Sequence, residues 1–355
     1  MLLSAFTSAG PALGLASAAL FGASTPLAKL LLGETDPWLL AGLLYLGSGI
    51  GLGAVHLRRQ MLGFAPPEAP LRRADLPWLA AVIVAGGVVG PVLLMLGLSV
   101  TPASSAALLL NVEGLATMGI AWAVFRENAD RRIVLGALAI LAGAALLSWQ
   151  GAAGGVGWGA LAIVGACLAW GIDNNLTRKL SAADPVQIAM LKGLVAGAVN
   201  LTLAIWHGAA LPRASIVLGA GIVGFFGYGV SLVLFVLALR HLGAARTGAY
   251  FSMAPFIGTV LALGLFGEPL TARLIAAAAL MGLGLYLHLV EHHEHEHEHE
   301  ELTHEHVHTH EMHHRHDHGP GSPAGEPHVH VHRHAPMVHR HPHYPDLHHR
   351  HTHAT

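Results

Sequence analysis

Ten apolar segments of about 20 residues each fill the first 290 residues of the chain. An α-helix of about 20 residues crosses a bilayer core of about 30 Å, so each segment is long enough to span a membrane. Short connections marked by Pro, Gly or charge separate the segments. The expected spans are residues 9–32, 37–57, 76–98, 103–125, 133–150, 158–178, 185–207, 215–239, 244–266 and 271–290. The pattern predicts an all-α membrane protein with ten transmembrane helices.

The composition changes sharply after these segments. Only 11% of the 355 residues are charged, against roughly 25% in soluble domains. Residues 291–355 hold 24 of the 28 histidines and 11 of the 21 acidic residues. This His-rich tail lacks the apolar residues needed to build a core, so we expect it to be disordered. The single cysteine, Cys167, excludes a disulfide framework and a thiolate metal site.

Basic residues alternate from loop to loop. Loops 58–75 and 126–132 carry four and three arginines, whereas the loops between them carry almost no base. Because positively charged loops stay in the cytoplasm, this alternation predicts cytoplasmic N- and C-termini in an inner (plasma) membrane. The first residues lack a basic region, so we interpret them as part of the first span and not as a cleaved signal.

The chain contains an internal repeat. The echoed pairs are 22–29 (GASTPLAK) with 171–178 (GIDNNLTR), Asp36-Pro37 with Asp184-Pro185, and 124–127 (VFRE) with 265–268 (LFGE). Five spans in each repeat is an odd number, so the two halves must have opposite orientations, an architecture typical of transporters. We expect two inverted five-helix repeats, 1–150 and 151–290, followed by the tail, 291–355.

Two stretches carry a resemblance to a known family. The first is the P-x-x-K element Pro26–Lys29, and the second is 238–274, which has Pro255 in mid-helix and Gly267-Glu268 near its end. On these residues, 9–290 resembles the EamA family of the drug/metabolite transporter superfamily. The first half departs from the family pattern, with Asn-Val-Glu-Gly at 111–114 in place of a proline and Arg-Glu at 126–127 in place of Gly-Glu. The resemblance implies secondary active transport, commonly export, without naming a substrate.

Polar groups inside the spans are candidates for a substrate site, because ionisable residues are costly there. Glu113 lies near the middle of its span, and Asn111 lies two positions before it. Ser252 is the residue of the second repeat that corresponds to Asn111. A carboxylate at this depth can bind a coupling proton or cation. The alternative is a carboxyl group that only fixes helix packing.

Other polar residues in the spans complete the candidate site. Asp173 and Lys192 lie at similar depth in neighbouring spans, which predicts a pair that either holds the helices together or latches the cytoplasmic side. Lys29 either contacts substrate or reaches to the membrane surface. The candidate substrate-binding residues are Thr25, Pro26, Lys29, Asn111, Glu113, Asp173, Asn174, Asn175, Lys192, Tyr250 and Ser252. No Ser/His/Asp constellation can be placed, so the sequence does not predict an enzyme.

The tail predicts metal binding. Imidazole is a ligand for Zn²⁺, Ni²⁺, Co²⁺ and Cu²⁺, and a tail of many histidines selects poorly between them. The candidate ligands are His292, His293, His295, His297, His299, His304, His306, His308, His310, His313, His314, His316 and His318. We expect no required cofactor beyond such a divalent transition metal at the tail.

Several functions stay open. The carrier moves a divalent metal that the tail buffers or senses, or it moves a metabolite such as an amino acid while the tail senses metal or pH, or the tail plays no part in transport. A membrane-anchored metal-buffering protein without transport is the non-transporter alternative. The expected partners are a small-molecule or metal-ion substrate and the lipid bilayer, with no nucleic acid, and a homodimer is one option.

Overall fold

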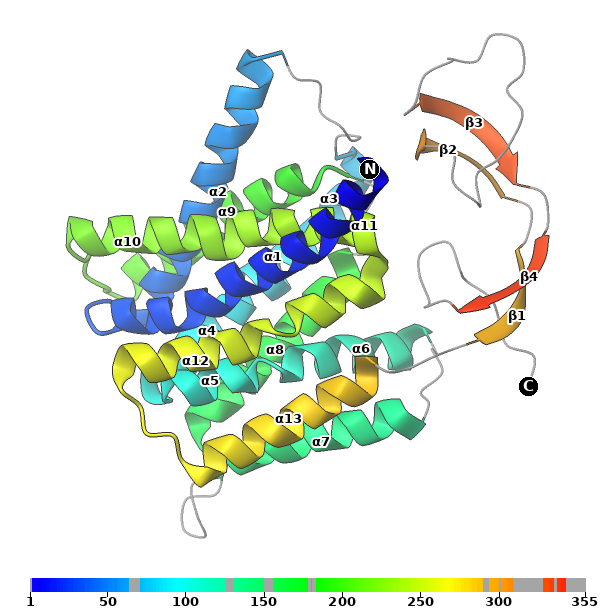
Figure 1. The fold of residues 1–355 in the computed structure, drawn as a ribbon. Coiled ribbons are helices and arrows are strands. Elements are labelled where there is room, and N and C mark those ends of the chain that lie inside the picture. Colours follow the sequence, from blue (N-terminus) through cyan, green and yellow to red (C-terminus); the bar gives the residue numbers. More distant parts are fainter. Residues whose placement is uncertain are drawn as a thin grey trace. The chain divides into compact units, whose positions relative to one another are not determined.

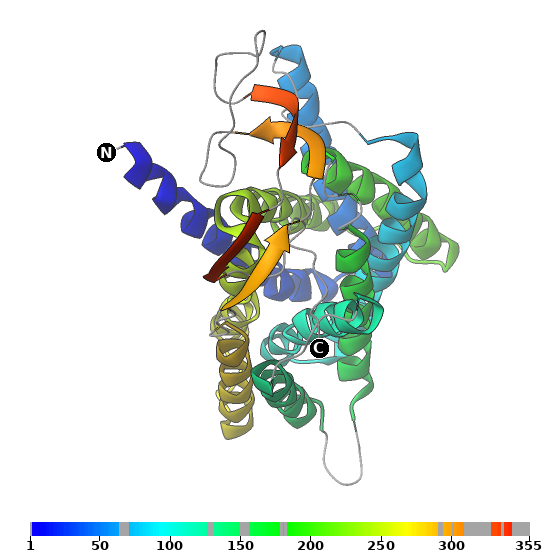
Figure 2. The same ribbon diagram turned by 90° about the vertical axis from the view of Figure 1, so that its right-hand side faces the viewer.

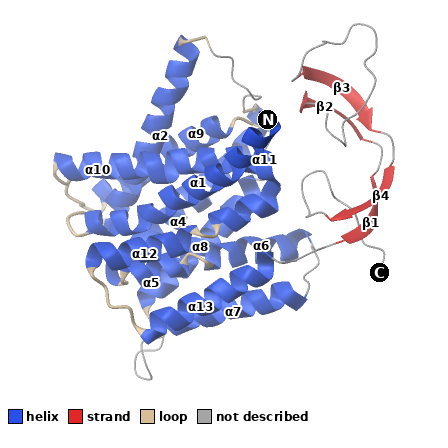
Figure 3. Cartoon of the chain, viewed as in Figure 1, coloured by secondary structure: helices blue, strands red, loops and turns tan. Residues whose placement is uncertain are grey.

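The computed structural model describes residues 2–63, 71–125, 131–149, 156–177, 180, 183–289, 294–299, 302–308, 328–334 and 337–342. The chain forms two compact units, Met1–Glu291 and His292–Thr355. The first unit is built from helices and the second carries strands (Figure 3). The predicted division of the first unit into two repeats at residue 150 stays a prediction.

The helices of the first unit follow the apolar segments. They are α1 (Leu2–Leu32), α2 (Pro37–Met61), the 3₁₀ helix η1 (Arg73–Asp75), α3 (Leu76–Val82), the π-helix η2 (Ile83–Val89), α4 (Gly90–Val100), α5 (Ala103–Leu109), α6 (Val112–Phe125), α7 (Arg131–Ser148), α8 (Trp158–Thr177), α9 (Pro185–Trp206), α10 (Ala214–Gly224), the π-helix η4 (Phe225–Val230), α11 (Ser231–Phe251), α12 (Ala254–Phe266) and α13 (Ala272–Leu289). Among the described residues, eight stretches are long and apolar enough to cross a membrane, and Ala254–Phe266 and Ala272–His288 are shorter apolar helices. The expected total of ten spans therefore stays a prediction for the last two.

One expected boundary is wrong. The sequence placed a connection at residues 240–243, but α11 runs without interruption from Ser231 to Phe251, and the helix breaks at Ser252 and Met253. Alanine, leucine and arginine, which are strong helix formers, dominate this segment, and the next proline is Pro255. Arg240 thus marks an expected loop in an apolar pattern, whereas an arginine does not by itself end a helix.

The echoed Asp-Pro pairs are helix start signals. Asp36 caps α2 by accepting hydrogen bonds from the backbone N–H groups of Trp38 (2.9 Å) and Leu39 (3.1 Å). Asp184 caps α9 in the same way, through the N–H of Val186 (2.8 Å). A proline at the first helical position suits both starts, because its missing N–H would have no partner there.

Small residues allow the helices to pack closely. α2 lies along α9, and α7 lies along α13 at one edge of the bundle (Figures 1 and 2). A Cβ added to Gly193 of α9 would lie 2.6 Å from the backbone N of Gly49 in α2, so these two backbones touch. In the rest of the bundle, α1 packs on α11 and α12, and α8 packs on α4 and α6.

Four irregular points interrupt the helices of the bundle. The π-helices η2 and η4 lie in the third and eighth apolar stretches along the chain. The fourth is broken at Leu110 and Asn111, between α5 and α6, and α11 is separated from α12 at Ser252 and Met253. Wide turns and broken helices inside a membrane bundle mark functional sites, because backbone groups leave the regular ladder there.

The described residues of the second unit form four strands. β1 (Glu294–His299) pairs antiparallel with β4 (Met337–Pro342), and β2 (Leu302–His308) pairs antiparallel with β3 (His328–His334). The sequence analysis did not expect these strands, and the predicted disorder of the tail as a whole stays a prediction. Histidine alternates with other residues, which gives the period of two that suits a strand, and the acidic first block pairs with the basic second block, with Glu296 opposite Arg340. The predicted ligands His292, His293, His310, His313, His314, His316 and His318 lie outside the described residues.

Candidate transport site

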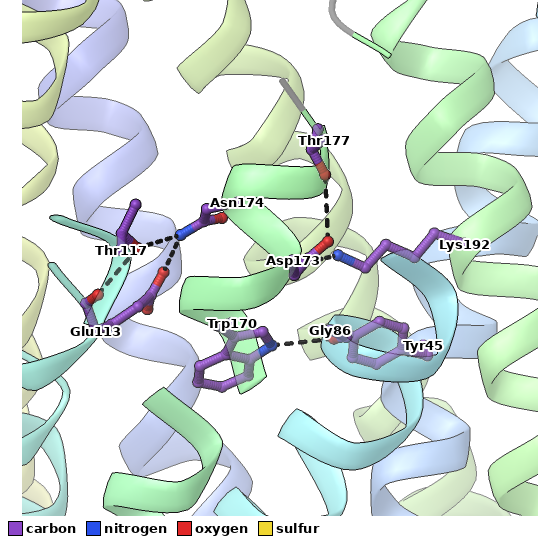
Figure 4. A network of polar contacts seen from close by, with 9 residues as sticks. All are labelled: Tyr45, Gly86, Glu113, Thr117, Trp170, Asp173, Asn174, Thr177 and Lys192. Atoms are coloured by element: carbon purple, nitrogen blue, oxygen red, sulfur yellow. Dashed lines mark hydrogen bonds and ion pairs between the residues drawn. The ribbon is translucent and has the colours of Figure 1, made fainter. Parts of the chain in front are cut away.

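Glu113 lies in the first turn of α6, directly after the break at residues 110–111. Its side chain is half-buried, and its Oε1 accepts a hydrogen bond from Nδ2 of Asn174 in α8 at 3.1 Å (Figure 4). The same amide donates to Oγ1 of Thr117 at 3.1 Å. Within the described part of the chain, the hydrogen-bond partner of the Glu113 carboxyl group is therefore a neutral amide, and no ion pair with a basic residue is seen.

Asp173 of α8 and Lys192 of α9 form an ion pair (Figure 4). Their side chains are only 6% and 13% exposed. Oγ1 of Thr177 donates a further hydrogen bond to Oδ1 of Asp173 at 3.2 Å. Because a buried charge without a partner is costly, removal of either Asp173 or Lys192 alone would destabilise the protein.

The π-helix η2 presents two backbone carbonyls to this region. The carbonyl of Gly86 accepts hydrogen bonds from the Tyr45 hydroxyl (2.7 Å) and from the Trp170 indole N–H (3.0 Å). The carbonyl of Gly87 accepts one from Nδ2 of Asn200 (3.0 Å). A π-turn releases carbonyls from the regular ladder, so side chains of α2, α8 and α9 can reach them.

Aromatic rings lie beside these carbonyls. Tyr45 contacts Tyr228 of η4 with ring centroids 5.4 Å apart, and Phe21 of α1 contacts Tyr228 at 6.0 Å and Trp170 at 6.4 Å. The sequence did not single out Tyr45, Trp170 or Tyr228. The available signal was that Tyr and Trp inside an apolar span need a partner for their polar ends, and the chain has only five tyrosines.

Three predicted site residues have neighbours other than Glu113, and two of them form hydrogen bonds close to themselves in the chain. Nδ2 of Asn111 donates to the carbonyl of Leu108 at 2.8 Å, and Oγ of Ser252 donates to the carbonyl of Gly248 at 2.7 Å, in its own helix. Tyr250 packs against α1, where a Cβ on Gly14 would lie 3.0 Å from its own Cβ. Asn111 and Ser252 lie in the two helix breaks and Tyr250 lies beside the second, and in the described part of the chain none of the three forms a hydrogen bond with the Glu113 side chain.

The remaining predicted residues divide between two places. Nδ2 of Asn175 donates to the carbonyl of Thr117 at 2.9 Å, and its buried Oδ1 has no hydrogen-bond partner within the described part of the chain. Thr25 and Pro26 are buried in α1. Lys29 donates hydrogen bonds to backbone carbonyls at the end of α4, whereas the Glu113 cluster consists of Glu113, Asn174 and Thr117. Across the described residues, no three His, Cys, Asp or Glu side chains gather closely enough to hold a metal ion.

Apolar helices that break beside buried charged groups define a multi-pass membrane transporter. A model of the EamA-like transporter family matches residues 8–149 and again residues 157–290. The chain therefore belongs to the EamA-like transporter family, of the drug/metabolite transporter superfamily that the resemblance predicted.

Known proteins with similar sequences agree with this assignment. An uncharacterized transporter of Methanothermobacter thermautotrophicus is 29% identical over 264 residues, which cover 70% of this chain and 77% of the relative. The uncharacterized inner membrane transporter YedA of Escherichia coli K12 is 26% identical over 238 residues, 66% of this chain and 76% of YedA. A solved crystal structure shares the fold, with a TM-score of 0.59 at 21% identity over 79% of this chain and 98% of its own.

Proposed function

We propose that the chain is a secondary active transporter of a small solute in the inner (plasma) membrane, built from two inverted repeats with both termini in the cytoplasm. The double match of one family model supports the repeat. Helix packing supports it too: α1 of the first half packs on α11 and α12 of the second, and α8 of the second packs on α4 and α6 of the first. Each half also carries one π-helix followed by one helix break.

Within this transporter, Glu113 carries the coupling proton or cation. The observation behind this assignment is its place at a helix break, with the amide of Asn174 as a neutral partner, while the neighbouring Asp173 is already neutralised by Lys192. A carboxylate held by an amide is open to a cation in a way that an ion-paired carboxylate is not. Asn111, Tyr250 and Ser252 contact substrate from the two breaks, and the Asp173–Lys192 pair latches the cytoplasmic side.

A transport assay in proteoliposomes tests this assignment. Wild-type protein is screened with amino acids, nucleosides and radioactive zinc and nickel under an imposed pH gradient. For a solute that is moved, Glu113→Gln is expected to lose the dependence of flux on the gradient. Glu34→Gln, which removes the same charge from an exposed position, should behave as wild type. Full gradient dependence in Glu113→Gln would remove the assignment.

The tail is proposed to bind divalent transition metals. The strand register supports pairwise binding, because directly opposite residues in an antiparallel pair have Cβ atoms about 5 Å apart. The opposed histidines are His295 with His341, His297 with His339, His304 with His332, His306 with His330, and His308 with His328.

The flux of radioactive zinc or nickel with and without residues 291–355 separates the remaining alternatives. Metal flux that persists in the truncated chain would show that the first unit, Met1–Glu291, which we call the membrane unit, is itself a metal carrier. Absence of metal flux in both forms would leave a metabolite or amino-acid exporter, whose tail either senses metal or pH or plays no part in transport. Transporter-family membership argues against the alternative of a metal buffer without transport.

A further inference from the structure

Thr101 and Pro102 form the turn between α4 and α5, and Lys29 stabilises the α4 end of this turn through hydrogen bonds. The Lys29 ammonium group donates hydrogen bonds to the backbone carbonyl of Leu98 and to those of Ser99 and Thr101, both at 3.1 Å. These carbonyls end α4, where no further turn of helix supplies partners for them. A cation is also favoured there by the helix dipole, so Lys29 acts as a C-terminal cap donated by α1.

The same turn is held from the α5 side by Glu268. Its Oε1 accepts a hydrogen bond from the N–H of Ala103 (2.8 Å), and its Oε2 accepts bonds from the N–H of Ser104 (3.1 Å) and from the Ser104 hydroxyl. Pro102, the N-cap residue of α5, makes no side-chain cap of its own. A carboxylate from a distant segment therefore takes the role that a local Asp or Ser usually has.

Glu268 is delivered to this turn by the end of α12. Gly267 has a φ of +60°, the left-handed conformation that favours glycine at a helix C-terminus. It ends α12, and Glu268 is the first residue after this change of chain direction. Oγ1 of Thr259, also on α12, donates to the carbonyl of Ser104 at 3.1 Å. Both contacts join the second half of the chain to the first.

The two holding groups differ in what they connect. Lys29 links α1 to α4 within the first half, whereas Glu268 links the second half to α5 of the first. Lys29 and Glu268 also attract each other electrostatically across the turn. If the halves move relative to one another, the hydrogen bonds of Lys29 to the turn can persist, because Lys29 and the turn belong to the same half. The hydrogen bonds of Glu268 to α5 must break, because they join the two halves.

We propose that Lys29 and Glu268 form a gate at the membrane face that carries the α4–α5 turn, which is the outer face in the expected orientation. Opening the transporter to that face requires Glu268 to leave the N-terminus of α5. This inference rests on the proposed transport function. It gives a role in transport to Lys29 and Glu268, whose hydrogen bonds go to the α4–α5 turn. Thr25 lies one helical turn from Lys29 in α1 and is 1% exposed, so it reports whether this end is closed.

Cysteine accessibility tests the gate without any solute. In a Cys167→Ala background, Thr25→Cys is labelled with a membrane-impermeant maleimide from each face of the membrane in turn. Glu268→Ala is expected to increase the labelling rate at least several-fold from the face of the α4–α5 turn only. Glu268→Gln, which keeps one acceptor oxygen, should give a smaller increase. Glu34→Gln is the matched control, because Glu34 is exposed and its closest charged partner, the exposed Arg213, is 4.0 Å away.

Two results would overturn the gate. Labelling that stays at the control rate in both Glu268 variants would show that Glu268 is only a helix cap. An equal increase from both faces would show general loosening of the bundle, which a fall in melting temperature measures independently. Glu268→Gln decides the matter if Glu268→Ala does not fold. Because no substrate is added, failure of the gate is distinguishable from failure of the proposed transport.

Discussion

At Gly86, the absence of a side chain decides where a carboxylate can lie. A Cβ on Gly86 would be 1.9 Å from Oδ2 of Asp173, so Gly86→Ala must displace Asp173 and disturb its pair with Lys192. We expect the free energy of unfolding to fall by about 1–3 kcal/mol, as for overpacking elsewhere. Gly119→Ala is the control, because a Cβ on Gly119 has nothing within 4 Å. Equal stability of the two variants in a detergent unfolding titration would contradict the close approach.

The Asp173–Lys192 pair gives a second test for single residues. Asp173→Asn or Lys192→Met alone leaves a buried charge without its partner, and each is expected to cost about 3–5 kcal/mol. The double variant should be more stable than either single variant, because no uncompensated charge is left. The same unfolding titration measures all four proteins. Additive losses would mean that the two charges do not interact in the folded protein.

The sequence could predict this pair, because counting residues along the helix rise places both charges at a similar distance from the expected ends of neighbouring spans. It could not predict the partners of Lys29 or Glu268. Lys29 binds carbonyls about 70 residues away, and Glu268 binds N–H groups 164 and 165 residues away. Backbone groups are present at every position, so no residue type marks which of them a distant charge will cap.

Among the elements, the π-helix η2 depends on side chains for the pairing of its carbonyls. Asn200→Ala is expected to leave the buried carbonyl of Gly87 without its side-chain donor and to cost about 1–3 kcal/mol. Tyr45→Phe should cost less, since the Trp170 N–H still bonds to Gly86. Thermal unfolding in detergent ranks the two. A larger loss of stability for Tyr45→Phe than for Asn200→Ala would contradict this ranking, because the hydrogen bond to Gly86 would then matter more than the one to Gly87.

Regular elements were easier to predict than the points at which they break. Hydrophobic length located the helices, and Asp36-Pro37 and Asp184-Pro185 marked two helix starts correctly. The π-helices have no such signal, because glycine-rich turns such as 86–87 serve equally well for close helix packing. In the tail, low apolar content suggested disorder, while the alternation of histidine with other residues already had the period of a strand.

For the molecule as a whole, the membrane unit and the tail are separate compact units, so they should respond separately to deletion. Removal of residues 291–355 is expected to leave the melting temperature of the membrane unit unchanged in detergent. Zinc binding by equilibrium dialysis should fall to the level of protein-free detergent. A truncated protein that still bound zinc at the full stoichiometry would place the metal site in the membrane unit.

The central proposal concerns the first unit: Glu113, at a helix break, takes up and releases the coupling proton or cation, and a proton is tested first. A hydrophobic carbodiimide modifies protonated carboxyl groups in membranes, and mass spectrometry locates the modified residue. The prediction is modification at Glu113 that decreases as the pH is raised, with no modification at this position in Glu113→Gln and little at the ion-paired Asp173. Modification of Asp173 in preference to Glu113, or modification of Glu113 that does not change with pH, would contradict the claim.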